Sequence, residues 1–298
     1  MAMISTLLPP LPHNVKLIIT DVDGTLLDSA HKIHPRTSNA LRALRQRHPD
    51  LPIVIASGKQ YHSCRHIRDA LDLPLHFPAA HCNGCLVYGG PEGLLVRENG
   101  LHPDAVEYIV EKTSRFGTFL FTHSSAILVS GGEGINKKDW CTIAGAYDVG
   151  IEDWTGDQDK VRDLLVKVRA GEITVAKITM CADEADLHRS ASEMAEMENA
   201  SSHPFKITRA IPFIFEAIPP HINKSTALLE ICDELRIDPS HVLAFGDGHN
   251  DVDMFRVAGH SVAMSNAMPA ARAAAKHVTV SNDEGGVGAF IEKIWTLT

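Results

Sequence analysis

Two short stretches of the chain concentrate oxygen-bearing side chains at close spacing. Asp21 and Asp23 directly follow one apolar run, and Asp247, Asn250 and Asp251 directly follow another. Neighbouring carboxylates repel one another unless a cation or a shared proton neutralises them. Carboxylate and amide oxygens are also the ligands that hard divalent cations prefer in proteins. We therefore expect these five residues to gather about one divalent cation, and magnesium is the ion that fits them best.

The same residues, joined by a serine and a lysine, could transfer a phosphoryl group. A carboxylate can attack phosphorus to give an aspartyl-phosphate, and we assign this role to Asp21. Asp23 would protonate the leaving oxygen and then deprotonate the attacking water. The Ser57 hydroxyl and the Lys224 ammonium would contact the transferring oxygens, over which charge spreads in the transition state. Ser57 has a simpler alternative role, which is to cap the helix expected after it.

The elements that must position these side chains are buried strands. Residues 16–20, 52–56 and 242–245 are strand-prone, mostly apolar and without polar alternation. This pattern is typical of central parallel strands covered on both faces. Each run ends at one of the polar clusters, and the carboxyl ends of strands are where open α/β sheets bind ligands. Helical patterns separate the runs, as right-handed parallel crossovers require. The sequence therefore predicts an α/β fold with a parallel sheet.

The pattern of the chain changes between its two ends. From residue 86 to residue 210, short strand signals and helices alternate irregularly, which favours a separate α+β module. Because 298 residues exceed what a single core usually serves, a second domain is expected. We predict that residues 1–85 and 211–298 form one core sheet and that residues 86–210 form an inserted domain.

Composition excludes several classes of partner. The formal net charge is −9 and the pI is about 6.0, so general binding to nucleic acid or to an anionic membrane surface is not expected. No apolar run is long enough to cross a membrane. Six cysteines without a recognisable secretory leader indicate reduced thiols and a cytoplasmic protein. Cys82 and Cys85 form an isolated CxxC pair, for which buried thiols are favoured over zinc or redox chemistry.

The four polar clusters resemble the sequence motifs of the haloacid dehalogenase (HAD) superfamily. DVDGT at 21–25, ASG at 56–58, the lysine of NKSTAL and GDGHND at 246–251 match its first to fourth motifs. The large insertion and the pair Asn83–Gly84 resemble the Cof-type phosphatases, which carry a big α/β cap. The resemblance implies a Rossmann-like core, magnesium dependence, an aspartate nucleophile and hydrolysis of small phosphate monoesters such as sugar phosphates. The phosphate-binding residues that we infer are Asp21, Gly24, Ser57, Gly58, Asn83, Gly84, Lys224 and Asn250.

Two other functions are compatible with the same residues. A phosphomutase on this core would return the phosphoryl group to a sugar instead of passing it to water. A catalytically idle, phosphate-binding regulatory protein would keep the fold without turnover, although the intact pair Asp21 and Asp23 argues against it.

Overall fold

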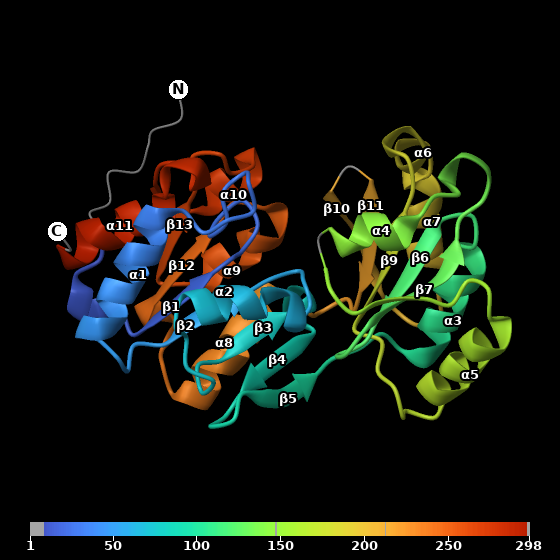
Figure 1. Ribbon diagram of the computed structural model, residues 1–298, viewed down its shortest axis with the longest axis horizontal. Helices are drawn as coiled ribbons and strands as arrows, with labels where there is room; N and C mark the ends of the chain where they lie inside the picture. Colours follow the sequence, from blue (N-terminus) through green and yellow to red (C-terminus); the bar gives the residue numbers. More distant parts are fainter. Residues whose placement is uncertain (1–8, 147, 212, 297–298) are drawn as a thin grey trace. The chain divides into compact units, whose positions relative to one another are not determined.

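The computed structural model describes residues 9–146, 148–211 and 213–296, which divide into two compact units (Figure 1). The first unit takes the described parts of Met1–Gly58, Cys64–Val96 and Asn223–Thr298. The second unit takes the described parts of Lys59–Ser63 and Arg97–Ile222. The first unit is therefore assembled from both ends of the chain, and the second is inserted between them.

The first unit is built on an eight-stranded sheet in the order β14-β13-β12-β1-β2-β3-β4-β5. The strands from β14 to β3 run parallel to their neighbours, and β4 is antiparallel to β3. The central strands are fully buried because their residues are apolar on both faces. The expected α/β class with a parallel sheet is thus confirmed. The strands are β1 (Leu17–Thr20), β2 (Ile53–Ala56), β3 (Ala79–His81), β4 (Leu86–Gly89), β5 (Leu94–Glu98), β12 (Val242–Gly246), β13 (His260–Ala263) and β14 (His277–Val278).

Helices of the first unit bury their apolar faces in one hydrophobic core with the sheet. Leu41 and Leu44 of α1 and Ile291 of α11 are fully buried there. Gly288 lets α11 approach α1 closely, because a Cβ atom at Gly288 would lie 2.7 Å from the backbone of Thr37. The helices are α1 (Pro35–Arg47), α2 (Arg65–Ala70), α8 (Lys224–Leu235), α9 (Val252–Val257), α10 (Pro269–Ala274) and α11 (Gly286–Trp295).

The second unit has its own six-stranded sheet in the order β10-β11-β9-β6-β7-β8, with its own core. Its strands pair antiparallel except β7 and β8, which are parallel. The strands are β6 (Gly117–Phe121), β7 (Ala126–Gly131), β8 (Ile151–Asp153), β9 (Lys177–Cys181), β10 (Lys206–Ile211) and β11 (Ile214–Ile218). The helices are α3 (Pro103–Lys112), α4 (Trp140–Gly145), α5 (Gln158–Arg169), α6 (Glu184–Arg189) and α7 (Ala191–Ala200).

The main insertion begins at 96/97 and ends at 222/223, not at the expected 85/86 and 210/211, and the short segment Lys59–Ser63 also belongs to the second unit. The change of pattern at residue 86 marks an antiparallel strand, β4, which continues the first sheet by pairing with β3. Strand β11 lies after residue 211 but pairs with β9 and β10, so it belongs to the second sheet. Among the described residues, no helix combines the length and the apolar character that a membrane span requires.

Candidate active site

Asp21 begins the loop that follows the central strand β1. Its backbone N–H donates to the carbonyl of Phe245 at 3.0 Å, which joins this loop to the end of β12. The Asp21 side chain is only 10% exposed. The parallel pairing of β1 with β12 therefore brings the first and the fourth motif to the same edge of the sheet.

Asp251 is held in the turn after β12 by backbone donors. Its Oδ2 atom accepts hydrogen bonds from the N–H groups of Asp247 at 3.0 Å and Gly248 at 2.9 Å. The side chain is fully buried, so these bonds offset part of the cost of removing its charge from water. Asp247 is fixed in turn by the hydroxyl of Thr25, which donates to its Oδ1 atom at 2.9 Å.

Lys224 is the first residue of α8 and supplies the positive charge of the site. The preceding Asn223 caps the helix, and the Asn223 and Thr226 side chains form a reciprocal capping box. Lys224 Nζ lies 2.5 Å from Asp21 Oδ1 and 2.7 Å from Asp251 Oδ1, and the side chain is fully buried. A buried cation at a helix N-terminus is unfavourable, and these two carboxylates offset that cost.

Asp21, Asp247 and Asp251 form the acidic cluster of the site. One oxygen from each carboxylate lies within 4.8 Å of those of the other two. Burial raises the pKa of Asp21 well above its ordinary value, and the charges of Asp251 and Asp247 add to this, while Lys224 opposes it. Burial and the charge of Asp251 also raise the pKa of Asp247 to about 6. The carboxylates therefore carry more negative charge than Lys224 alone compensates.

These properties fit a hard divalent cation. Oxygen donors that converge from three carboxylates are what magnesium binds, and a divalent ion would favour the ionised form of these groups, which burial disfavours. The pKa of Lys224 itself stays raised despite its burial, because Asp21 and Asp251 stabilise its charged form. The lysine therefore remains a cation beside the carboxylates and does not replace the ion.

Gly24 allows the two aspartate loops to come together. Its φ angle is +73°, a conformation that residues with a side chain rarely adopt. A Cβ atom at this position would overlap Asp247 Oδ2. Its carbonyl also accepts a hydrogen bond from Asn266 Nδ2 at 2.9 Å. The glycine is thus required both by the turn and by the proximity of Asp247.

Ser57 of the second motif and Asn250 of the fourth motif are both hydrogen-bonded to Asn83. The N–H of Asn83 donates to the Ser57 carbonyl at 3.0 Å, and Asn83 Oδ1 accepts from Asn250 Nδ2 at 2.9 Å. A Cβ atom on Gly58 would lie 3.2 Å from Asn83 Oδ1, and one on Gly84 would overlap the Asn223 carbonyl. The structure therefore brings Ser57, Gly58, Asn83, Gly84 and Asn250 together beside the start of α8.

Asp23 lies apart from the acidic cluster. Strand β1 ends at Thr20, so the alternation that would point Asp21 and Asp23 the same way does not extend through them. The Asp23 side chain is 44% exposed, and its Oδ1 atom lies 3.9 Å from His31 Nδ1. The carboxylate that joins Asp21 and Asp247 is that of Asp251. An exposed carboxylate two residues from Asp21 is still suited to exchange a proton with a bound substrate.

Sequence reasoning missed two residues that support the site. Thr25 orients Asp247, and Asn266 holds the Gly24 carbonyl. Thr25 is the last residue of DVDGT, so its place in the motif was a usable signal. Asn266 lies in a loop after β13, and no pattern in the sequence distinguishes it from other loop asparagines.

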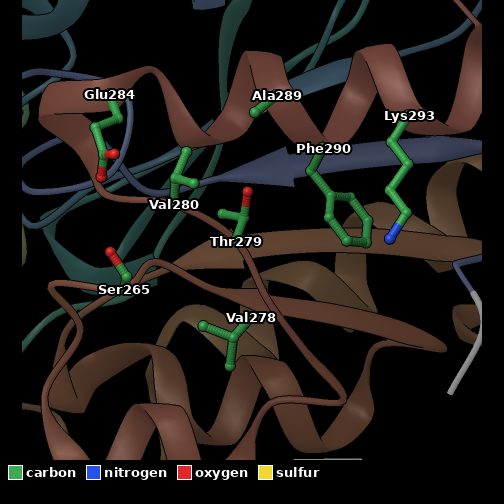
Figure 2. Close-up of a pocket in the computed structure, with 8 residues that line it drawn as sticks. All are labelled: Ser265, Val278, Thr279, Val280, Glu284, Ala289, Phe290 and Lys293. Atoms are coloured by element: carbon green, nitrogen blue, oxygen red, sulfur yellow. The ribbon is translucent and has the colours of Figure 1, made fainter. Parts of the chain in front are cut away.

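A separate hollow in the first unit lies between α11 and the segment around β14. Figure 2 shows Phe290 and Lys293 extending from α11 toward Val278 and Thr279, which help to line it. None of its lining residues belongs to the four motifs. Its mixture of apolar and isolated charged side chains does not provide converging oxygen donors, so the candidate site is the acidic cluster.

Comparison with known proteins shows the family of this chain. Residues 18–291 match the family model described as haloacid dehalogenase-like hydrolase. An uncharacterized hydrolase of Schizosaccharomyces pombe is 36% identical over 97% of this chain and 93% of its own length. The HMP-PP phosphatase of an Enterobacter species is 26% identical, with 89% of each chain covered.

A solved structure agrees with these sequence matches. The crystal structure of a haloacid dehalogenase-like hydrolase from Bacteroides thetaiotaomicron superposes with a TM-score of 0.75 and 25% identity, covering 94% of this chain and 99% of the other. The sequence motifs, the fold and the family match therefore lead to the same conclusion. As its motifs indicate, this chain belongs to the haloacid dehalogenase-like hydrolases.

Proposed function

We propose that the protein is a magnesium-dependent phosphatase that hydrolyses a small phosphate monoester, such as a sugar phosphate, through an aspartyl-phosphate. The observation that carries the proposal is the buried arrangement of Asp21, Asp251 and Lys224 beside Asp247. Its membership of a hydrolase family and its likeness to a protein named as a phosphatase support the same reaction.

In the first half of the reaction, an oxygen of Asp21 attacks the phosphorus of the ester. The bond between phosphorus and the ester oxygen breaks, and Asp23 gives its proton to that leaving oxygen. The Lys224 ammonium holds Asp21 Oδ1, keeps the carboxylate oriented and favours its ionised form against the effect of burial. The bound magnesium ion would supply positive charge against the oxygens of the transferring group. Asp21, Asp247 and Asp251 would hold this ion, with Asn250 beside them.

In the second half, water attacks the phosphorus of the aspartyl-phosphate and gives a proton to Asp23. The bond between phosphorus and Asp21 breaks, which restores both carboxyl groups and releases inorganic phosphate. The Ser57 hydroxyl would donate to a phosphate oxygen in both halves, because charge develops there each time. Gly24, Gly58, Asn83 and Gly84 would line the phosphate site, where the glycines let the neighbouring segments approach closely.

We further propose that the second unit acts as a cap that excludes water and selects the substrate. Its insertion between Ser57 and Lys224 supports this role, since both neighbouring segments belong to the proposed site. A small metabolite is the expected substrate, because a protein similar over most of the chain is named for HMP-PP. The acidic composition and the cysteines support a cytoplasmic location.

The test is phosphate release from a panel of phosphorylated metabolites with magnesium and with a chelator. We expect turnover with magnesium, its loss on chelation, its recovery when magnesium is restored, and no turnover by Asp21→Asn. Asp50→Asn, which changes an exposed aspartate outside the cluster, is the matched control and should act like the parent protein. Isomerised sugar phosphate without released phosphate would show a mutase, and full activity of Asp21→Asn would exclude the proposed nucleophile.

A further inference from the structure

Two histidines and an aspartate come together in the second unit, in a part of the molecule that the proposed reaction does not use. His102 is the N-cap residue of α3, Asp104 is the second residue of that helix, and His203 lies between α7 and β10. One ligand atom from each side chain lies within 4.8 Å of the other two. Asp104 Oδ2 is 3.7 Å from His102 Nδ1 and 3.5 Å from His203 Nε2.

The hydrogen bonds around this cluster show which ring nitrogens carry lone pairs. His102 Nδ1 accepts from the Asp104 N–H at 3.3 Å, so this nitrogen carries a lone pair, which a bound metal ion would take from this long hydrogen bond. His203 Nδ1 lies 3.2 Å from Ser202 Oγ. In the tautomer that donates Nδ1–H to this hydroxyl, the lone pair of His203 Nε2 faces Asp104. A hydrogen bond of this kind to the second ring nitrogen is what orients a metal-ligating histidine.

The two imidazole rings also constrain each other's charge. They stack with their centroids 3.8 Å apart and their planes 10° apart. Two positive rings at this separation would repel by about 1 kcal/mol even in water. An imidazole ring binds a metal ion only in its neutral form, through the lone pair of a ring nitrogen. A metal cation with affinity for imidazole would bind the neutral rings and the Asp104 carboxylate together.

We propose that His102, Asp104 and His203 bind one zinc-class divalent ion, with water at the remaining position. Bonds of about 2.0–2.1 Å at tetrahedral angles place neighbouring donor atoms about 3.3–3.4 Å apart, close to the two separations observed. One ring must turn out of the stack, because a nitrogen lone pair lies in the ring plane, and this torsion is broad in histidine. Imidazole donors favour zinc over magnesium, so this site and the acidic cluster would bind different ions.

Such an ion would join the start of α3 to the segment that leads into β10. These parts of the second unit are about one hundred residues apart in the sequence, as the numbers of His102 and His203 show. Binding to the folded protein alone would stabilise it, because ligands that bind only the native state shift the folding equilibrium toward it.

The test is a titration of the full chain with zinc in excess magnesium, using calorimetry and the visible absorption of cobalt as a substitute ion. We expect one zinc ion to bind, a tetrahedral cobalt spectrum, and a raised Tm. His102→Ala, Asp104→Asn and His203→Ala should each weaken zinc binding at least about tenfold and lose the cobalt spectrum. His188→Ala removes an exposed histidine from α6 of the same unit and is the matched control.

Several outcomes would overturn the proposal. Equal zinc affinity in His203→Ala and the parent protein would place any bound zinc elsewhere, and equal loss in His188→Ala would show a nonspecific effect. Absence of zinc binding, together with a protonated His203 that pairs with Asp104 in ring-nitrogen NMR spectra, would show an ordinary ion pair. Circular dichroism in chelator should match between the variants and the parent, which separates lost binding from lost folding. His102→Ala should lower the Tm in chelator, because it removes the N-cap of α3, whereas His203→Ala should not. None of these readouts depends on phosphatase activity.

Discussion

Lys224 Nζ lies 2.5 Å from Asp21 Oδ1, although 203 residues separate them in the chain. The ion pair joins the loop after β1 to the first turn of α8, and its lysine is fully buried. Such a pair contributes less to stability than its attraction suggests, because burial of both charges is costly. Its role is better understood as fixing the position and charge of Asp21.

Removal of the lysine charge should damage both stability and function. Lys224→Met leaves Asp21 and Asp251 buried without their cation, so the free energy of unfolding in chelator should fall by about 3 kcal/mol. Phosphate release should fall at least about a hundredfold, because the charge beside the transferring oxygens is lost. Urea unfolding and steady-state kinetics measure the two effects. Lys32→Met, at an exposed lysine, should change neither, and an active Lys224→Met would contradict the role given to this residue.

Gly24 and Gly90 have nearly equal φ angles, so their alanine variants distinguish backbone strain from steric overlap with a neighbouring side chain. Gly24 has φ +73° and a Cβ there would overlap Asp247 Oδ2, whereas Gly90 has φ +71° and nothing within 4 Å. Both alanine variants should lose about 1 kcal/mol of stability from the backbone conformation. Only Gly24→Ala should also weaken magnesium binding, by about tenfold, because it displaces Asp247. Calorimetric magnesium titration distinguishes them, and similar magnesium affinities would refute the steric argument.

Asn83 and Asn250 should act as one unit. Their side chains share a hydrogen bond of 2.9 Å, and Asn83 also contacts the Ser57 carbonyl through its N–H. Asn83→Ala and Asn250→Ala should each lower kcat/KM by about tenfold, and the double variant should be hardly worse than either one. A double-mutant cycle on kcat/KM measures this coupling. Strictly additive losses would show that the two residues work independently.

The raised pKa of Asp247 predicts how stability depends on pH without metal. Burial and the charge of Asp251 raise this pKa to about 6, above the value of about 3.9 for an unfolded chain. Between about pH 4 and pH 6 the native protein keeps a proton that the unfolded protein releases. The free energy of unfolding should therefore decrease as the pH rises through this window, by about 2 to 3 kcal/mol from this group.

The measurement is urea unfolding in chelator across this pH range, for the parent protein and Asp247→Asn. The variant cannot ionise at this position, so its decrease with pH should be smaller, although Asp21 still contributes. Magnesium should remove most of the difference at neutral pH, because it favours the ionised carboxylates. Identical pH profiles for the two proteins would show that Asp247 titrates normally.

Much of the first unit was predictable from sequence. The apolar runs that become β1, β2 and β12 lack alternation, so both their strand character and their central position follow from the pattern. Motif spacing also predicted that Asp21, Lys224 and Asp247 would meet. The proposed roles of the site residues remain predictions, because geometry brings the groups together without showing the reaction.

Other features depend on contacts that no local pattern reveals. Strand β4 looks like the start of a new module until its pairing with β3 is known. Helix α4 is hard to predict because it is short and buries chiefly Trp140, and no sequence pattern marks the break at Ser190 that separates α6 from α7. The absence of Asp23 from the acidic cluster depends on the conformation of the loop after β1, which no pattern in the sequence specifies.

The pairing of β1 with β12 also has a consequence for biosynthesis. Leu17 pairs in register with Val242, so the central sheet of the first unit cannot close until most of the polypeptide has left the ribosome. The second unit is nearly continuous in the chain and has a core of its own, so it can fold while the first is still incomplete. During translation the emerging β1 segment therefore exposes an apolar strand without its partner β12 until that strand has been synthesised.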